Sequence, residues 1–152
     1  KAKDIANQRI KNANYLDRGL RKLEQITIPP RLEGYRLVYH LYIVFAKYRD
    51  ELLEYCIDKG IEALIHYPVP IYRQPALKML GHNKGDFPVT DAHADKIITF
   101  PCDQYLSKKK MDYIMRKPLM FPLLEMLLVK NKEKLVKEKE KVNGYGILRM
   151  VS

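Results

Sequence analysis

The sequence predicts a small α/β domain of the α+β kind, in which a sheet of three or four mostly antiparallel strands is covered by helices. Helical periodicity alternates with short runs of β-branched and aromatic residues, in the order helix, strand, helix, strand, helix, strand, helix. The connections between these elements are short. A chain of 152 residues, of which 47% are hydrophobic and 30% charged, can bury one core of this size.

The first element is an amphipathic helix over residues 3–24. Apolar residues recur there at steps of three and four, which places them on one stripe: Ala6, Ile10, Ala13, Leu16, Leu20 and Leu23. The segment Ile26-Thr-Ile-Pro-Pro30 ends the helix, because a proline pair cannot continue it.

Two buried strands are expected next, over residues 38–45 and 61–66. The first reads VYHLYIVF, a composition typical of strands. Residues 49–59 between them have helical periodicity, and Gly60 supplies a left-handed stop. Tyr67-Pro-Val-Pro70 ends the second strand.

The third strand is expected over residues 96–100, closed by Pro101. It follows a short helical turn that ends at Leu80-Gly81 and a short helix over residues 91–95 with Thr90 as its N-cap. Ser107 is the expected N-cap of a last helix over residues 108–117, which Pro118 ends.

The chain divides by composition into residues 1–117 and a tail over residues 118–152. The tail begins with an apolar stretch over residues 119–129 and continues with a stretch over residues 130–141 that is almost wholly Lys and Glu. We expect one or two helices there, the first of which must bury an apolar face.

The net charge of +10 raises the possibility of a nucleic-acid partner. The distribution of charge argues against it, because the lysines of residues 130–141 alternate with glutamates, as on a solvated helix face. Binding of nucleic acid is therefore not expected.

Other features favour a cytoplasmic protein. The most apolar stretch is interrupted by Pro122 and Glu125 and is too short to span a membrane. The start Lys1-Ala-Lys-Asp4 is unlike a secretory leader, and the missing initial Met indicates a piece of a longer protein. Cys56 and Cys102 lack paired spacing, so we expect reduced thiols rather than a disulfide or a zinc site.

Several short sequences, in a fixed order, carry a family signature. They are Val38-Tyr-His-Leu-Tyr42, Arg49-Asp-Glu-Leu52, Gly60-Ile61, His66-Tyr-Pro-Val-Pro70, Gly85-Asp-Phe-Pro88, Ala94-Asp95 and Phe100-Pro101. Together they resemble the C-terminal small domain of the DegT/DnrJ/StrS-type sugar aminotransferases. The segment IITFPCDQYL, residues 97–106, is most similar to members that aminate dTDP-keto-deoxyhexoses. The resemblance covers residues 7–117.

The resemblance implies a fold-type I aminotransferase that works as a homo-oligomer with pyridoxal phosphate (PLP). Such an enzyme transfers an amino group from glutamate to a nucleotide-linked keto-sugar. The family's PLP-binding residues belong to a large domain, so we expect no cofactor and no catalytic residue in this chain, which would be inactive alone. The small domain would supply one wall of the substrate cleft.

His66 and Tyr67 are the residues expected to contact substrate, because they end a strand before two prolines. The alternative is a histidine satisfied by local hydrogen bonds. Arg36 and Arg73 are further candidates for binding a phosphate or carboxylate, although an arginine in such a position is more often an ordinary surface residue. His40 is expected in a core or interface.

The remaining candidates favour structural roles. Tyr39, Tyr42 and Tyr72 are expected to pack in the core and at its rim. His82 and His93 lack the spacing of metal ligands, and no metal site is expected. Ser107-Lys-Lys-Lys110 matches the family's Ser-x-x-Lys motif literally, but its place at a helix start indicates an N-cap.

Two other functions remain open. One is a basic, non-enzymatic module that binds nucleic acid or acidic surfaces, and the other is a scaffold fragment that self-associates through exposed apolar faces.

Overall fold

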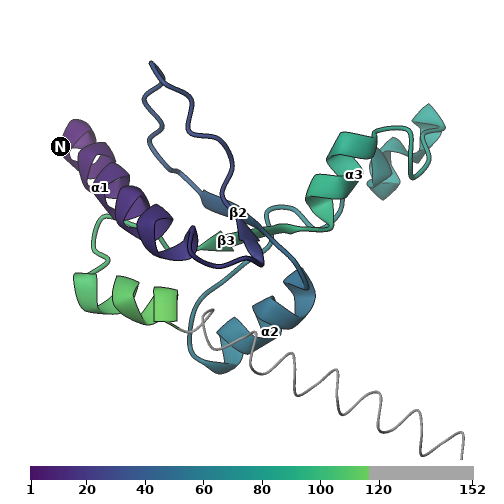
Figure 1. The fold of residues 1–152 in the computed structure, drawn as a ribbon. Coiled ribbons are helices and arrows are strands. Elements are labelled where there is room, and N and C mark those ends of the chain that lie inside the picture. The colour runs from purple at the N-terminus through teal and green to yellow at the C-terminus, as the bar shows by residue number, and fades with distance from the viewer. Residues whose placement is uncertain (117–152) are drawn as a thin grey trace, which may run out of the picture. The chain divides into compact units, whose positions relative to one another are not determined.

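The computed structural model describes residues 1–116, and its centre is a three-stranded antiparallel sheet (Figure 1). The strands β1 (Ile26–Thr27), β2 (Tyr42–Ala46) and β3 (Ile97–Phe100) lie in the order β1-β2-β3. Tyr42 is opposite Phe100 and Phe45 is opposite Ile97. The predicted fold class, a small antiparallel sheet with helices, is confirmed.

Helix α1 (Ala2–Leu20) buries the predicted apolar stripe, with Ala13, Leu16 and Leu20 fully inaccessible. It ends four residues before the predicted end at Glu24. Two tight turns follow, in which Leu23 N–H donates to the Leu20 carbonyl at 3.0 Å. The chain is thereby free to pair Ile26 with Ala46 in β1, a strand that the sequence did not predict.

The strand predicted over residues 38–45 begins only at Tyr42. Leu37 and Val38 are 40% and 47% exposed, and Tyr39 has a left-handed backbone with φ 50°. A left-handed residue cannot belong to a strand, so the pairing starts after it. Composition alone does not distinguish this exposed segment from the buried strand that follows.

The strand predicted over residues 61–66 is wrong except at one residue. Leu64 forms an isolated antiparallel bridge with Thr99. Pro101 follows Thr99 by two residues, just past the end of β3, and has no N–H to donate to Glu62, so the ladder cannot extend in that direction.

Helix α2 (Arg49–Asp58) ends as expected at Gly60, whose φ of 70° is left-handed. Its inner face is formed by Leu52 and Cys56, both inaccessible. Cys56 and Cys102 are free and buried, and burial raises the pKa of each thiol to about 12.

Residues 67–96 form a segment that we call the arm, which extends from the sheet in Figure 1. It contains two 3₁₀ helices, η1 (Ile71–Arg73) and η2 (Pro75–Leu80), and helix α3 (Pro88–Ala94). Gly81 ends η2 with a φ of 74°, as expected. Thr90 is not an N-cap, because α3 already begins at Pro88, a residue suited to the first helical position.

Residues 108–116 are helical and begin at the predicted cap, because Lys110 N–H donates to Ser107 Oγ at 3.3 Å. This helix is joined to α1 by a hydrogen bond from Tyr15 Oη to Asp112 at 2.6 Å. The predicted helix end at Lys117 and the whole predicted tail, residues 118–152, lie outside the described residues.

Helix α1 is tied to the sheet by a buried polar cluster around Asp17. Arg31 donates to Asp17 from Nε at 3.1 Å and from Nη2 at 3.0 Å, and Tyr42 Oη donates to it at 2.7 Å. Burial, together with the Asp17 carboxylate, raises the pKa of Tyr42.

No helix within residues 1–116 has the length and apolar character needed to cross a bilayer.

Candidate functional site

The segment from Glu62 to Pro70 lies between two hollows. The first, which we call the His66 hollow, has a volume of about 360 Å³. Its polar lining comes from α1, from the chain before β2, and from both sides of the Leu64–Thr99 bridge: Arg9, His40, Glu62, His66, Thr99 and Asp103. The second, the Tyr67 hollow, has a volume of about 430 Å³ and is lined by Tyr67, Val69, Pro70, Ile71, Gln74, Thr90, His93, Ala94 and Ile97.

His66 is half-buried at the wall of the first hollow. Its Nδ1 lies 3.1 Å from Thr99 Oγ1. Its ring meets the ring of Tyr67 edge-on, with 5.6 Å between centroids, and the peptide bond joining the two residues is cis. The structure thus gives His66 a local hydrogen-bond partner and also places it beside a hollow. This position is compatible both with a histidine that contacts substrate and with a histidine that is satisfied by a local hydrogen bond.

Tyr67 points away from the core and is 72% exposed. Across the Tyr67 hollow lies His93 of α3, whose ring stacks on Phe45 at 4.6 Å. The lining of this hollow therefore combines aliphatic side chains and aromatic rings with the hydroxyls of Tyr67 and Thr90. Such a surface can contact a ligand that is partly apolar and partly polar.

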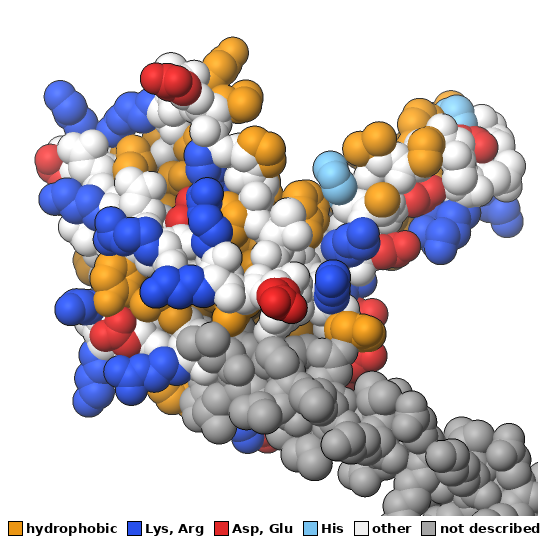
Figure 2. All heavy atoms as spheres, viewed as in Figure 1, with side chains coloured by type: hydrophobic (Ala, Val, Ile, Leu, Met, Phe, Trp, Pro, Cys, Tyr) orange, Lys and Arg blue, Asp and Glu red, His pale blue; other side chains and the backbone are white. Residues whose placement is uncertain are grey.

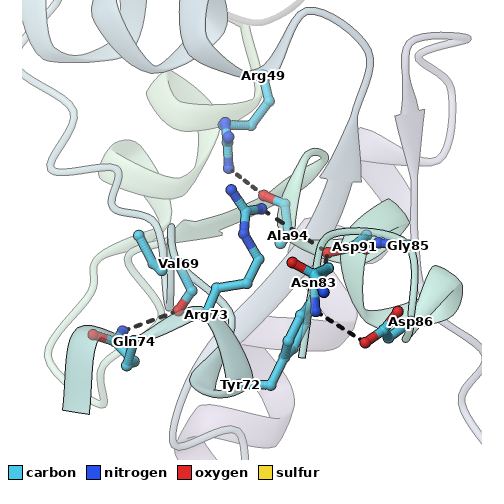
Figure 3. Close-up of polar contacts among 10 residues, drawn as sticks. All are labelled: Arg49, Val69, Tyr72, Arg73, Gln74, Asn83, Gly85, Asp86, Asp91 and Ala94. Carbon is cyan, nitrogen blue, oxygen red and sulfur yellow. Dashed lines mark hydrogen bonds and ion pairs between the residues drawn. The ribbon is translucent and has the colours of Figure 1, made fainter. Parts of the chain in front are cut away.

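Arg73 lies in the arm and is 3.9 Å from the Asp91 carboxylate (Figure 3). Asp91 also accepts hydrogen bonds from Tyr72 Oη and from Gly85 N–H, the latter at 2.8 Å. The Tyr72 hydroxyl, followed by the Gly85 amide, lowers the pKa of Asp91. Arg73 thus faces a carboxylate of its own arm rather than either hollow.

Arg49 holds the base of the arm. Its guanidinium donates to the carbonyls of Ala94 at 2.9 Å and Ile97 at 3.2 Å, as Figure 3 shows for Ala94. Within the arm, Gln74 Nε2 donates to the Val69 carbonyl at 3.2 Å. These bonds link α2, α3 and β3, and so fix the residues that line the Tyr67 hollow.

Arg36 lies apart from the other three candidates. It is exposed, donates to Asn7 Oδ1 at 2.8 Å and lines a third hollow, of about 450 Å³, together with Tyr35 and Tyr39. The structure therefore brings His66 and Tyr67 together and places Arg36 and Arg73 elsewhere. A role for any of the four in binding remains a prediction.

Arg9 and Thr99 are polar residues of the His66 hollow that the sequence did not single out. Arg9 donates to Gln104 Oε1 at 3.2 Å and to the carbonyls of Tyr39 at 3.2 Å and His40 at 3.4 Å. These partners are far from Arg9 in the sequence, so no local pattern could have indicated the contact.

Lys110 is exposed in the first turn of a capped helix. A lysine that forms a Schiff base with PLP must be enclosed with groups for the ring and the phosphate, and this surface position does not fit that requirement. Among residues 1–116, the His, Cys, Asp and Glu side chains form no group of three that could hold a metal ion.

Exposed cations gather over α1 and the helix of residues 108–116, where Figure 2 shows many Lys and Arg side chains on one face. We call this the basic face and define it by Arg18 of α1 and by Lys108, Lys109 and Arg116 of the second helix, which lie around Tyr15 and Asp112. Asp112 lies within it and is bound by Tyr15, whose ring also contacts Arg18.

The sequence is similar to two known proteins, a sensory transduction protein and a transaminase. It is 30% identical over 102 residues to the erythromycin biosynthesis sensory transduction protein EryC1 of Saccharopolyspora erythraea, covering 67% of this chain and 28% of that protein. It is 32% identical over 96 residues to the dTDP-3-amino-3,4,6-trideoxy-alpha-D-glucose transaminase of Streptomyces venezuelae, covering 63% of this chain and 25% of that protein. The chain spans about a quarter of the length of these relatives.

The fold is also similar to that of a solved enzyme. The crystal structure of S. venezuelae DesV in complex with a ketimine intermediate matches with a TM-score of 0.71 and 26% identity, over 74% of this chain and 30% of that one. The model of the DegT/DnrJ/EryC1/StrS aminotransferase family matches residues 1–118. The chain therefore belongs to the DegT/DnrJ/EryC1/StrS aminotransferase family.

Proposed function

We propose that this chain forms the C-terminal domain of a PLP-dependent aminotransferase that transfers an amino group from glutamate to a nucleotide-linked keto-sugar. The relatives named as transaminases of dTDP-amino-sugars support this substrate class. The enzyme would work in the cytoplasm as a homo-oligomer. Within it, residues 1–117 would form the small domain and residues 118–152 a divergent helical tail.

The observation that supports a substrate-binding role is the position of His66 and Tyr67 between two hollows. A nucleotide sugar is an elongated ligand with hydroxyl-rich and aromatic parts, so adjacent hollows of different character suit it. The His66 hollow offers donors and acceptors for sugar hydroxyls through His66, Arg9 and Glu62. The Tyr67 hollow offers apolar and aromatic surface.

The position of Lys110 supports a separation of PLP chemistry and sugar binding between two parts of this enzyme. Because Lys110 is exposed and does not fit a PLP site, we place the PLP-binding lysine and its supporting groups in another part of the complete enzyme. The domain described here would orient the sugar and exclude water from one side of the cleft. By itself it would not catalyse amino transfer.

A titration with dTDP-glucose tests the proposed binding. The 152-residue chain is observed by NMR with and without the substitution Tyr67→Phe, and saturable shifts of the His66 and Tyr67 resonances are expected, with weaker binding in the variant. Tyr105→Phe is the matched control, because Tyr105 is 84% exposed and lines neither hollow. Shifts that are absent, or that respond equally to both substitutions, would contradict the proposal.

The basic face supports a second candidate function, binding of a nucleic acid. Cations from two adjacent helices lie on one side of the molecule, as contacts with a phosphate backbone require. Affinity for double-stranded DNA that falls steeply with salt, and that Lys108→Ala with Arg18→Ala reduces, would favour this function over substrate binding.

A further inference from the structure

Thr99 is one of four buried polar residues among those described, and it is 7% exposed in strand β3. Both of its backbone groups bond to Leu64: Thr99 N–H donates to the Leu64 carbonyl at 2.8 Å, and Leu64 N–H donates to the Thr99 carbonyl at 3.1 Å. This single bridge is what attaches the segment leading to His66 to the sheet.

The side chain of Thr99 reaches two residues further, to His66 Nδ1 at 3.1 Å. Residues 64 and 66 are separated by one position, so they lie on the same side of an extended segment. Thr99 therefore holds the backbone at Leu64 and the imidazole at His66 at the same time. The ring is fixed at one nitrogen while it lines the His66 hollow.

A neutral imidazole has one nitrogen that donates and one that accepts. If the Thr99 hydroxyl donates to Nδ1, the proton of the neutral ring resides on Nε2. In that state Nε2–H is the group that can donate to a ligand oxygen in the hollow. The other polar groups of the hollow include the Arg9 guanidinium and the Glu62 and Asp103 carboxylates.

We propose that Thr99 is a positioning residue for substrate binding: its hydroxyl donates to His66 Nδ1 and so orients the ring with Nε2–H toward the sugar. This inference rests on the proposed function, since it assumes that His66 contacts the nucleotide sugar. Thr99 itself would not touch the substrate.

The tautomer of His66 gives the first test. In the ¹⁵N-labelled 152-residue chain at a pH where the ring is neutral, NMR should find the proton on Nε2. Thr99→Val removes the hydroxyl and keeps the shape, and it should shift the population toward the Nδ1–H form; Thr99→Ser keeps the hydroxyl and should preserve the wild-type spectrum. A wild-type ring protonated on Nδ1 would overturn the proposal and needs no variant. Identical populations in the wild type and in a Thr99→Val variant with native-like amide spectra would overturn it as well.

Binding gives the second test and separates this inference from the proposed function. The dissociation constant of dTDP-glucose should rise about fivefold in Thr99→Val, as expected for the loss of one hydrogen bond, and should return to the wild-type value in Thr99→Ser. If the wild-type chain shows no response at His66, the proposed function fails and the substrate role of Thr99 fails with it. If the wild type responds and Thr99→Val binds equally well, only the role of Thr99 fails.

Discussion

Arg31 donates two hydrogen bonds to the Asp17 carboxylate, and the same carboxylate accepts a hydrogen bond from the hydroxyl of Tyr42. The side chain of Asp17 is 9% exposed and that of Arg31 is 23% exposed. Helix α1, the loop after β1 and strand β2 therefore meet at one carboxylate. This cluster holds the helix that supplies Arg9 to the His66 hollow.

Replacing Asp17 with Asn should destabilise the fold. The substitution leaves the Arg31 charge without its partner in a mostly buried position, which costs about 2–4 kcal/mol. Urea denaturation measures the loss in the free energy of unfolding. Asp4→Asn is the matched control: its side chain is 83% exposed, so its effect should stay within about 0.5 kcal/mol. Equal effects of the two substitutions would show that the Asp17 cluster does not stabilise the fold.

Gly60 should be replaceable by other residues only at the cost of backbone strain. Its φ is 70°, and a Cβ added there would meet no atom within 4 Å, so the penalty is purely conformational. Gly60→Ala should cost about 1–2 kcal/mol in the free energy of unfolding. Gly60→Asn should cost less, because asparagine tolerates the left-handed region. Alanine and asparagine variants of equal stability would contradict the observed end of α2.

The arm should loosen in acid. The Tyr72 hydroxyl and the Gly85 amide favour the ionised form of Asp91, so its folded pKa is below its unfolded value near 3.9. The stabilisation is therefore present above that unfolded value and is lost as the pH falls through the lowered folded pKa. Hydrogen exchange at the Gly85 amide measures it.

We expect faster exchange of the Gly85 amide at low pH relative to amides of β2. In Tyr72→Phe this loosening should begin at a higher pH, because the main group that lowers the pKa of Asp91 is absent. Exchange that follows the same pH course in the variant and the wild type would contradict the contact.

Incubation with PLP should yield no saturable aldimine absorbance that depends on Lys110. The lysine lies exposed in a helix that Ser107 caps, so it should react no differently from Lys108 or Lys109. Lys110→Ala should leave the PLP spectrum unchanged, and Lys108→Ala is the matched control. A saturable yellow species lost only in Lys110→Ala would contradict the assignment of PLP to another part of the enzyme.

Features that depend on a few neighbouring residues were predictable from the sequence. Gly60 ends α2, and Ser107 caps the helix after β3, because a left-handed stop and a cap are decided within one turn of the chain. The strand over residues 61–66 was not predictable in the same way. Whether it pairs depends on the partner strand, where Pro101 lacks a donor for Glu62.

The site was predictable only in part, for a related reason. His66 and Tyr67 stand out in the sequence because a strand-like run meets two prolines. Thr99 and Arg9 do not stand out, since their contacts cross 33 residues to His66 and 95 residues to Gln104. Arg73 was a reasonable candidate by residue type, but its ion pair with Asp91 depends on how the arm folds back on itself.

The contacts of a bound nucleotide sugar test the central claim most directly. In the ¹⁵N- and ¹³C-labelled 152-residue chain with dTDP-glucose, intermolecular NOEs should connect ligand protons to the rings of both His66 and Tyr67. NOEs confined to the basic face, at residues such as Arg18 and Lys108, would contradict a substrate-binding role for the His66–Tyr67 segment.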